Sequence, residues 1–308
     1  MDRNTGHVVK RISTNEGISV IYDEWKKTDL KNSEERIAYF YDLIRKHIAI
    51  LSQMTDLNLS QIPVVISGMA SSSIGMKELP YATVPFGLDG KGIFTDRFRA
   101  VDGREIILVS GLRTETDVMR GEEVQLIGLE PIVRKFEETF SQVVILLPGT
   151  HSKHVFIRHN QVIDFTTSLT GELFQLLSTN GLLRQSVVRS NEPANEVGWR
   201  FFRQGVRYSD QKPLLQSLFS VRTNDLFAKI SPEDNYHYMS GLLIGYELKD
   251  LRKQENTQFI LCCPEHLAPF YENAIDELGL SNRTFSESPA NFNQYMVEAQ
   301  IKILDRFL

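Results

Sequence analysis

Cysteine is nearly absent from this chain. Its 308 residues include only two, Cys262 and Cys263, which are adjacent. Neighbouring side chains in a strand point to opposite faces, so this pair is badly placed to form a disulfide with itself. A chain without disulfides suits a reducing compartment, and the polar N-terminus has no hydrophobic signal core. We therefore expect a cytoplasmic protein.

Long apolar runs and an excess of basic residues are missing as well. No stretch approaches the roughly 18 apolar residues that a membrane-spanning helix needs. The 34 lysines and arginines are outnumbered by 39 aspartates and glutamates, so the formal net charge is −5. The chain therefore lacks the basic footprint of a nucleic-acid-binding protein. We expect neither a membrane nor a nucleic acid as its partner.

The first half of the chain alternates between apolar strand-like runs and helix-like segments. Such alternation predicts an α/β domain with a partly parallel sheet. The helix at 33–53 has Ser33 in position to cap its N-terminus. The other expected elements are strands at 7–12, 18–22, 63–69, 105–109 and 143–147, and a helix at 117–139.

The second half begins with a β-hairpin and continues mostly as helix, which predicts a second α/β domain. We place the domains at 1–145 and 146–308, with the last helix, 290–306, as a segment that can pack back on the first domain. The first strand of the hairpin is expected at 154–158, the second follows a turn at 159–161, and one further strand is expected at 259–263. The expected helices cover 170–179, 190–206, 211–228, 232–253, 266–278 and 290–306.

The loop at residues 148–153, between the strand expected at 143–147 and the one that starts at 154, has the composition of a phosphate-binding loop. Gly149 has no Cβ, so backbone N–H groups can converge there on an anion. Thr150, Ser152 and Lys153 add hydroxyl donors and a positive charge. An ordinary hairpin with a polar turn is the alternative, and from these residues alone both interpretations stay open.

Two carboxylates and an arginine fall near the start of the helix expected at 117–139. Arg120, Glu122 and Glu123 could serve a reaction, with a glutamate accepting the proton of an attacking hydroxyl. Acidic residues in a first helical turn also interact well with the helix dipole, so a purely structural role is the alternative.

Other kinds of active site have weaker support. Ser152 and His151 could form a nucleophilic pair, but the chain has no G-x-S-x-G nucleophile elbow. Zinc binding by His151, His154 and His159 is disfavoured, because these histidines would face different ways around a hairpin and no cysteine is near. Ligand sites in open α/β sheets lie at the carboxyl ends of strands. Glycine-containing or cysteine-containing loops follow three other strands, at 68–75, 111–113 and 262–264, and would define one cleft if they were adjacent.

Four blocks of sequence in one order carry a resemblance to a known family. They are SGMASSSIGMKELPYATVP (67–85), SGLRTETDVMRGEEVQLIG (110–128), LPGTHSKHVFIRHNQVIDFTTSLTGELFQLL (147–177) and SGLLIGYEL (240–248). Together they resemble the 2-keto-3-deoxygalactonokinases, sugar-acid kinases of the actin/hexokinase-like ATPase superfamily. The resemblance runs over nearly the whole chain, and the strings MRGEE-x-Q and PGTHSK-x-V are its most specific parts.

The resemblance implies a fold, a reaction and ligands. The fold is α/β, with two ribonuclease-H-like domains and the ligands between them. The reaction moves the γ-phosphoryl group of ATP, with Mg²⁺, to the 6-hydroxyl of 2-keto-3-deoxygalactonate in galactose and galactonate breakdown. The substrate is thus a small sugar acid.

The resemblance also implies roles for residues of this sequence. Glu122 takes the place of the catalytic base, with Glu123 as the alternate, and Arg120 would neutralise phosphate or the substrate carboxylate. The residues implied on the sugar-acid side are Gly68, Ser71, Gly75, Pro80 and Tyr81. Those implied near the nucleotide are Gly149, Thr150, His151, Ser152, Lys153, Thr170, Gly171, Glu172 and Cys263.

The chain also departs from the family pattern. Family members begin with a strand carrying D-W-G-[ST]-[TS]-x-x-R, the first phosphate loop, whereas residues 1–8 here resemble the strand after it. We therefore expect the first domain to lack its N-terminal strand, and an exposed edge there would favour a homodimer. Met76 and His154 replace common tryptophans, and Cys263 replaces a glycine near the adenosine end. One interpretation is an active kinase with an upstream segment; the alternative is a catalytically inactive homologue that binds a sugar acid or a protein.

Overall fold

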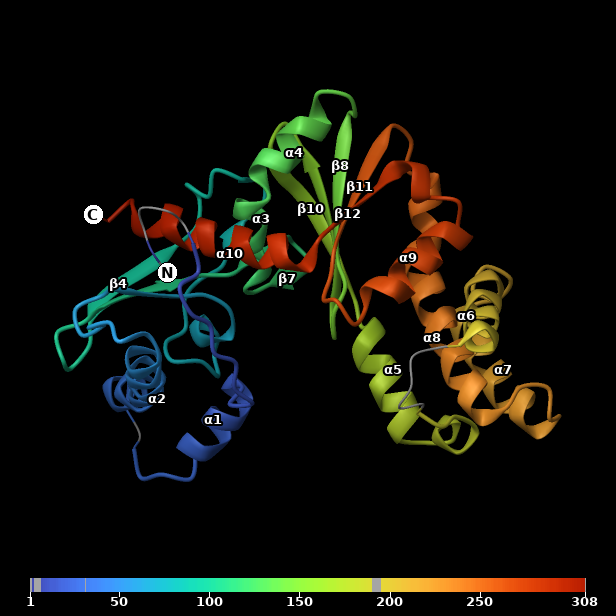
Figure 1. Ribbon diagram of the computed structural model, residues 1–308, viewed down its shortest axis with the longest axis horizontal. Helices are drawn as coiled ribbons and strands as arrows, with labels where there is room; N and C mark the ends of the chain where they lie inside the picture. The colour runs from blue at the N-terminus through green and yellow to red at the C-terminus, as the bar shows by residue number, and fades with distance from the viewer. Residues whose placement is uncertain (1, 3–6, 31, 190–194, 308) are drawn as a thin grey trace. The chain divides into compact units, whose positions relative to one another are not determined.

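A computed structural model describes residues 2, 7–30, 32–189 and 195–307, which fall into two compact units (Figure 1). The first unit comprises the described residues up to Lys135, together with His159–Asp164 and those from Ala290 onward. The second comprises Phe136–Arg158 and the described part of Phe165–Pro289. Among the described residues, no helix combines the length and the apolar character that crossing a bilayer requires.

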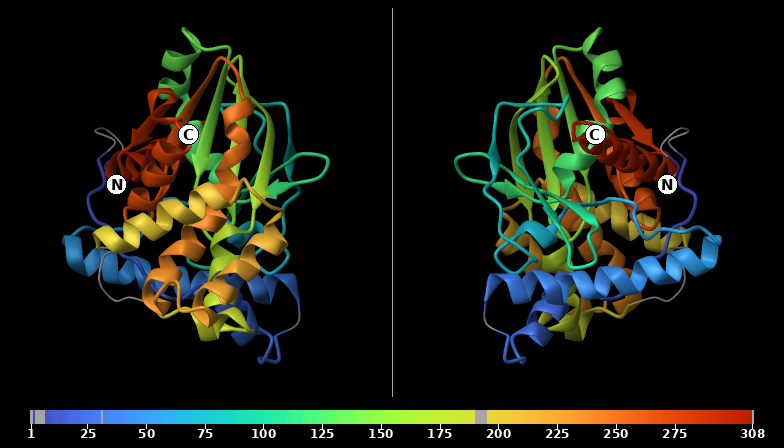
Figure 2. Two further views of the ribbon diagram at one scale, coloured as in Figure 1. Left: turned by 90° about the vertical axis from the view of Figure 1, so that its right-hand side faces the viewer. Right: turned by 90° about the vertical axis from the view of Figure 1, so that its left-hand side faces the viewer.

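The first unit opens with two helices, α1 (Ile18–Trp25) and α2 (Ser33–Thr55). The strands expected at 7–12 and 18–22 are wrong: residues 7–12 are irregular and 18–22 are helical. Ile18, Ile21 and Tyr22 recur at helical spacing and pack into one core cluster with α2, which favours helix. The expected helix at 33–53 is confirmed and is the long blue helix of Figure 2.

The residue that caps α2 differs from the one expected. Asn32, not Ser33, accepts a hydrogen bond from the backbone N–H of Glu35 at 2.8 Å. The Glu35 carboxylate in turn accepts from the N–H of Asn32 at 3.1 Å. This capping box satisfies two helix-end donors, whereas a cap at Ser33 would leave the helix one residue shorter.

Two small sheets complete the core of the first unit. In one, β1 (Val64–Ile66) pairs in parallel with β5 (Glu105–Val109), which pairs antiparallel with β4 (Thr95–Arg99). The strand expected at 105–109 is thereby confirmed, and the one expected at 63–69 is shorter, because a 3₁₀ turn begins at Met69. The second sheet has the order β2-β6-β7, with β2 at Ala82–Thr83, β6 at Leu112–Arg113 and β7 at Val118–Met119.

The prediction of a single helix at 117–139 is wrong, because the segment begins as a strand and its helical part is interrupted. Residues 118–119 form β7, and the segment then contains two helices, α3 (Glu122–Gly128) and α4 (Glu130–Glu137). Pro131 explains the break, because proline lacks an N–H and is tolerated only in a first helical turn. The last helix, α10 (Pro289–Leu304), packs on α3 (Figure 1), with the backbone of Tyr295 against Gly128.

The second unit is built on a sheet with the strand order β12-β11-β8-β9-β10. β12, β11 and β8 are parallel, and β9 returns antiparallel to β8. The first residues of β10 belong to the first unit, where they pair with β3 (Phe86–Gly87). The strands are β8 (Gln142–Leu147), β9 (Ser152–Arg158), β10 (Gln161–Ser168), β11 (Thr257–Cys262) and β12 (Thr284–Glu287).

These strands confirm the hairpin and the mixed α/β class. The turn places His159 and Asn160 at φ of 53° and 57°, a left-handed pair typical of tight hairpins. Strand β12 was not expected, because its sequence TFSE is short and lacks a run of apolar residues.

Five longer helices cover this sheet or extend from it. The expected helices from 170 to 278 exist with shifted ends, and the predicted start at 190–194 lies outside the described residues. The helices are α5 (Thr170–Thr179), α6 (Glu196–Tyr208), α7 (Leu214–Leu226), α8 (Pro232–Leu248) and α9 (Ala268–Glu277). Short 3₁₀ turns occur at Met69–Ser71, Leu183–Ser186, Lys249–Lys253 and Ser281–Arg283.

The close packing of α6 on α8 depends on glycines (Figure 2). A Cβ on Gly241 would overlap the carbonyl oxygen of Phe202, and one on Gly205 would overlap that of Tyr238. Both obstacles are backbone atoms of the facing helix, so neither can move aside without shifting that helix.

We expect Gly241→Ala to lower the free energy of unfolding by about 1–3 kcal/mol, the usual range for overpacking. The loss should appear although alanine favours helix over glycine by up to about 1 kcal/mol. Urea denaturation measures it. The matched control is Gly17→Ala, where a Cβ has nothing within 4 Å and φ is −71°. Equal midpoints for the two variants would contradict the steric explanation.

Candidate functional site

The loop between β8 and β9 is joined directly to the N-terminus of α5. The N–H of Glu172 donates to the carbonyl of Thr150 at 3.0 Å. The Nε2 atom of His151 lies 2.5 Å from Oε2 of the Glu172 carboxylate. Residues about twenty positions apart in sequence thus form one surface, which combines a loop with the positive end of a helix dipole.

The glycine that this junction requires is Gly171 and not Gly149. A Cβ on Gly149 would have nothing within 4 Å, so the absence of a side chain there is not needed for packing. A Cβ on Gly171 would lie 2.5 Å from the Gly149 carbonyl oxygen and 2.8 Å from the Cα of Thr150. The close approach of the two backbone segments is therefore made at Gly171, and the role expected of Gly149 toward an anion stays a prediction.

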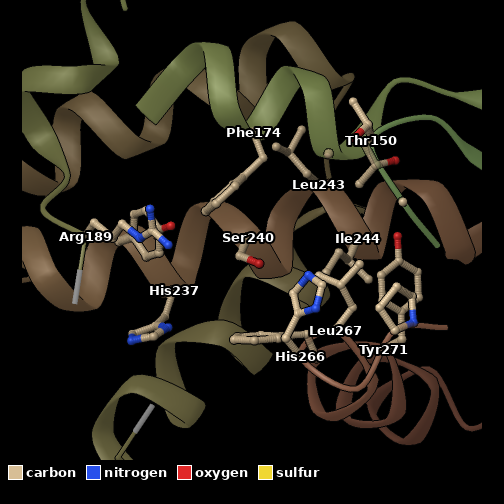
Figure 3. A pocket seen from close by; sticks show the side chains of 16 residues that line it. Thr150, Phe174, Arg189, His237, Ser240, Leu243, Ile244, His266, Leu267 and Tyr271 are labelled. Atoms are coloured by element: carbon tan, nitrogen blue, oxygen red, sulfur yellow. The ribbon is translucent and has the colours of Figure 1, made fainter. Parts of the chain in front are cut away.

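A cavity of about 540 Å³ opens beside this junction, entirely within the second unit (Figure 3). Thr150 and Tyr271 lie at one end of it, and Arg189 and His237 lie at the other. Aromatic and aliphatic side chains make up most of the wall between them. The lining residues are Gly149, Thr150, Thr170, Gly171, Phe174, Arg189, Tyr236, His237, Ser240, Leu243, Ile244, Pro264, His266, Leu267, Phe270 and Tyr271.

Four of the nine residues expected near the nucleotide line this cavity: Gly149, Thr150, Thr170 and Gly171. The side chains of His151 and Glu172 contact each other beside it. Ser152 is 1% exposed, and its hydroxyl lies 3.0 Å from the hydroxyl of Tyr271. Lys153, the expected phosphate cation, is 4% exposed at the start of β9.

Cys263 lies in the apolar core and not along the cavity. It is 3% exposed and packs in the cluster that contains Leu146 and Leu261. Burial raises the pKa of its thiol to about 12, so the thiol is neutral at physiological pH. The neighbouring Pro264 lines the cavity instead.

A second cluster, in the first unit, gathers the residues expected on the sugar-acid side. The guanidinium of Arg120 donates from Nη1 to the carbonyl and hydroxyl oxygens of Ser71, at 2.5 and 2.6 Å. It also stacks 4.1 Å from the centre of the Tyr81 ring. Two of the guanidinium's contacts thus hold the 68–79 loop, so Arg120 positions this loop.

Glycines let the loops of this cluster approach one another closely. Gly68 has a φ of 89°. A Cβ on Gly121 would lie 3.3 Å from the Cα atom of Gly68. Gly75 packs on the backbone of Ala70 so closely that any Cβ would overlap it. Pro80 is exposed just before Tyr81. The expected residues of the 67–85 and 110–128 blocks therefore meet in space.

The two glutamates at the start of α3 have different environments. Glu122 is half-buried, and its carboxylate accepts a hydrogen bond from the N–H of Arg120 at 3.0 Å. Glu123 is fully buried, and both its oxygens accept from the N–H of Gly121, at 2.9 and 2.7 Å. Burial raises the pKa of Glu123 to about 8, so its carboxyl group is mainly protonated at neutral pH. Of the pair, Glu122 is the more accessible carboxyl group.

The raised pKa of Glu123 should make stability fall with pH. The folded state keeps a proton that the unfolded chain loses above its usual pKa of 4.5. The folded state is therefore progressively disfavoured between about pH 4.5 and 8, and the effect levels off above that. We expect Glu123→Gln, which cannot ionise, to gain stability relative to wild type across this window. Denaturation curves at pH 5 to 9 measure the difference, and a difference independent of pH would rule out this account.

Sequence reasoning missed the buried carboxylate of Glu247 on α8. Its side chain is 2% exposed and accepts hydrogen bonds from Thr170 and Tyr271. A signal was available, because Glu247 is the one charged residue in SGLLIGYEL, and a charge in a buried helical segment needs partners. Among the described residues, no three His, Cys, Asp or Glu side chains are grouped closely enough to hold a metal ion.

Comparison with known proteins shows what this chain is similar to. The model of the 2-keto-3-deoxy-galactonokinase family matches residues 1–293. The 2-dehydro-3-deoxygalactonokinase of Escherichia coli (strain K12) is 32% identical over 239 residues, 75% of this chain and 76% of that protein. The "Probable 2-dehydro-3-deoxygalactonokinase DgoK1" of Rhizobium meliloti (strain 1021) is 30% identical over 259 residues, 82% of this chain and 80% of that protein.

A crystal structure of a Sinorhizobium meliloti protein assigned to the 2-dehydro-3-deoxygalactonokinases superposes with a TM-score of 0.72 at 27% identity. The match covers 87% of this chain and 84% of that one. The fold and the family model thus place the chain among the kinases of sugar metabolism. It belongs to the 2-keto-3-deoxy-galactonokinase family.

Proposed function

We propose that this protein transfers the γ-phosphoryl group of ATP to the 6-hydroxyl of 2-keto-3-deoxygalactonate. The observation that carries the proposal is the cavity of the second unit, whose loop and helix N-terminus meet at Gly171. Two ribonuclease-H-like domains, as in other kinases of this superfamily, are part of the same proposal.

The nucleotide would lie along the cavity with its phosphates at the end formed by Gly149, Thr150 and Gly171. Backbone N–H groups at a helix N-terminus favour anions, and small residues let phosphates come close. The base would lie among the apolar and aromatic side chains, where Phe174 and Tyr236 pack edge to face at 4.9 Å. Mg²⁺ commonly keeps several waters and binds substrate phosphates through few protein ligands, so we expect it to enter with ATP and to neutralise phosphate charge.

The sugar acid would bind at the cluster of the first unit. Arg120 holds the loop that contains Ser71 and stacks on Tyr81, which leaves Glu122 as the acceptor for the proton of the attacking hydroxyl. One argument for an inactive homologue was that Cys263 replaces a glycine near the adenosine end. This argument is weakened, because Cys263 does not line the cavity.

A coupled assay with 2-keto-3-deoxygalactonate and MgATP tests the activity, for which we expect turnover on the order of 1 s⁻¹ or faster. Calorimetry with MgATP and with the sugar acid separately tests the two sites. Binding of both ligands without turnover would support the inactive homologue, and binding of neither would overturn the proposal.

Filling the cavity should weaken the binding of the nucleotide and leave the binding of the sugar acid unchanged. We expect Ser240→Trp, at a half-buried lining position on α8, to weaken MgATP binding at least about tenfold, because the indole would occupy the space for the nucleotide. Calorimetry should show unchanged binding of the sugar acid, which serves as the internal control. Unchanged MgATP affinity would place the nucleotide elsewhere.

A further inference from the structure

The buried carboxylate of Glu247 is the centre of a polar network that the proposed reaction does not use directly. Its Oε2 atom accepts from the hydroxyls of Thr170 and of Tyr271, the latter at 2.9 Å. Its Oε1 atom lies 3.2 Å from Nε2 of His154. These partners come from α5, α9 and β9, so one carboxylate ties three elements to α8.

The network has a direction because a hydroxyl group has only one proton to donate. The Tyr271 hydroxyl donates to Glu247, so its oxygen is left to accept from the hydroxyl of Ser152, 3.0 Å away. The Ser152 oxygen in turn accepts from the N–H of Gly149, at 3.4 Å. A chain of donors thus runs from the cavity loop inward to Glu247.

This direction changes the role of Ser152, which the sequence suggested as a phosphate donor, and gives one to Thr170, which was expected only to lie near the nucleotide. The hydroxyl protons of Ser152 and Thr170 are both directed at protein groups, so neither is available to a phosphate. Ser152 fixes the loop at Gly149, and Thr170 fixes the first residue of α5. Both ends of the junction across Gly171 are therefore held by one carboxylate.

We propose that Glu247 is a positioning residue, which holds the 149–152 loop and the N-terminus of α5 as one rigid surface for the nucleotide phosphates. The proposal rests on the proposed nucleotide site, and it adds that the rigidity of this site originates in α8. A buried carboxylate that only stabilised the fold would affect global stability without acting selectively on these two segments.

The test compares Glu247→Gln and Tyr271→Phe with a matched control, Tyr238→Phe. Tyr238 is 2% exposed in the same unit and its hydroxyl lies 2.8 Å from that of Ser220, but it does not line the cavity. Hydrogen exchange of the ligand-free proteins is followed in peptides covering 149–152 and 170–173, which contain the hydrogen-bonded amides of Gly149 and Glu172. We expect exchange there to quicken at least tenfold in Glu247→Gln and Tyr271→Phe, and to stay unchanged in Tyr238→Phe.

MgATP affinity supplies the second measurement. We expect the Kd to rise about tenfold in Glu247→Gln and Tyr271→Phe, with Tyr238→Phe unchanged. Unchanged exchange in both variants, or equal quickening in the control, would overturn the role of Glu247. Failure of the wild-type chain to bind MgATP would instead overturn the proposed function, and the exchange data would still decide whether Glu247 fixes the two segments.

Discussion

Glu122→Gln is expected to lower kcat for phosphoryl transfer by about 10²–10⁴-fold, the usual contribution of a positioned general base. Glutamine keeps the size of the side chain and an oxygen that can accept from the N–H of Arg120, so the start of α3 should stay intact. What it loses is the capacity to take a proton. Because this capacity is needed only during reaction, the KM values for both substrates should change little.

The matched control for this result is Glu123→Gln. Glu123 is adjacent and fully buried, and the carboxyl is mainly protonated at neutral pH, so an amide resembles the form that is already present. We expect its kcat to stay within a few-fold of wild type at pH 7. Steady-state kinetics by coupled detection of ADP measures both variants. A large loss in Glu123→Gln with little loss in Glu122→Gln would reverse the assignment of the base.

Gly171→Ala is expected to lower kcat/KM for MgATP by about 10²-fold, the typical cost of displacing a binding element by about 1 Å. The new Cβ would meet the Gly149 carbonyl oxygen at 2.5 Å and the Thr150 Cα at 2.8 Å. Both are backbone atoms, so the loop and the start of α5 must move apart. The loss should fall on nucleotide binding, and calorimetry with MgATP should show it directly.

Gly149→Ala distinguishes this steric effect from a general intolerance of the loop. A Cβ there meets nothing within 4 Å, so we expect stability within about 0.5 kcal/mol of wild type and a smaller loss of affinity. If Gly149→Ala proved the more damaging of the two, a ligand rather than the protein would be using the space beside that glycine.

Much of the fold was predictable from local pattern. Strands β5, β8 and β11 are apolar runs of the expected length, and α2 and α5 follow helical spacing. The hairpin of β9 and β10 was marked by its turn residues. The errors fell where pattern is ambiguous: 18–22 is short enough for strand or helix, and the break before α4 depends on how a single proline is accommodated.

Four of the residues expected near the nucleotide line the cavity of the second unit, and their roles stay predictions. Sequence placed Ser152, Lys153 and Cys263 with the nucleotide, and nothing in one sequence reveals that all three side chains are buried. Glu122 and Glu123 cannot be distinguished in the sequence, and only their different burial in the folded chain tells them apart. The partners of Glu247 lie 24 to 93 positions away, and only the folded chain brings such residues together.

Helix α8 has a consequence for the length of the ligand. It supplies His237 at one end of the cavity (Figure 3) and Glu247, which anchors the loop at the other. Ten residues of helix separate His237 from Glu247, which is about 15 Å at 1.5 Å per residue. The distance between the two ends of the cavity is therefore fixed by one continuous, largely buried helix. Because one helix lies along the whole cavity, we expect this spacing to stay the same when a ligand binds.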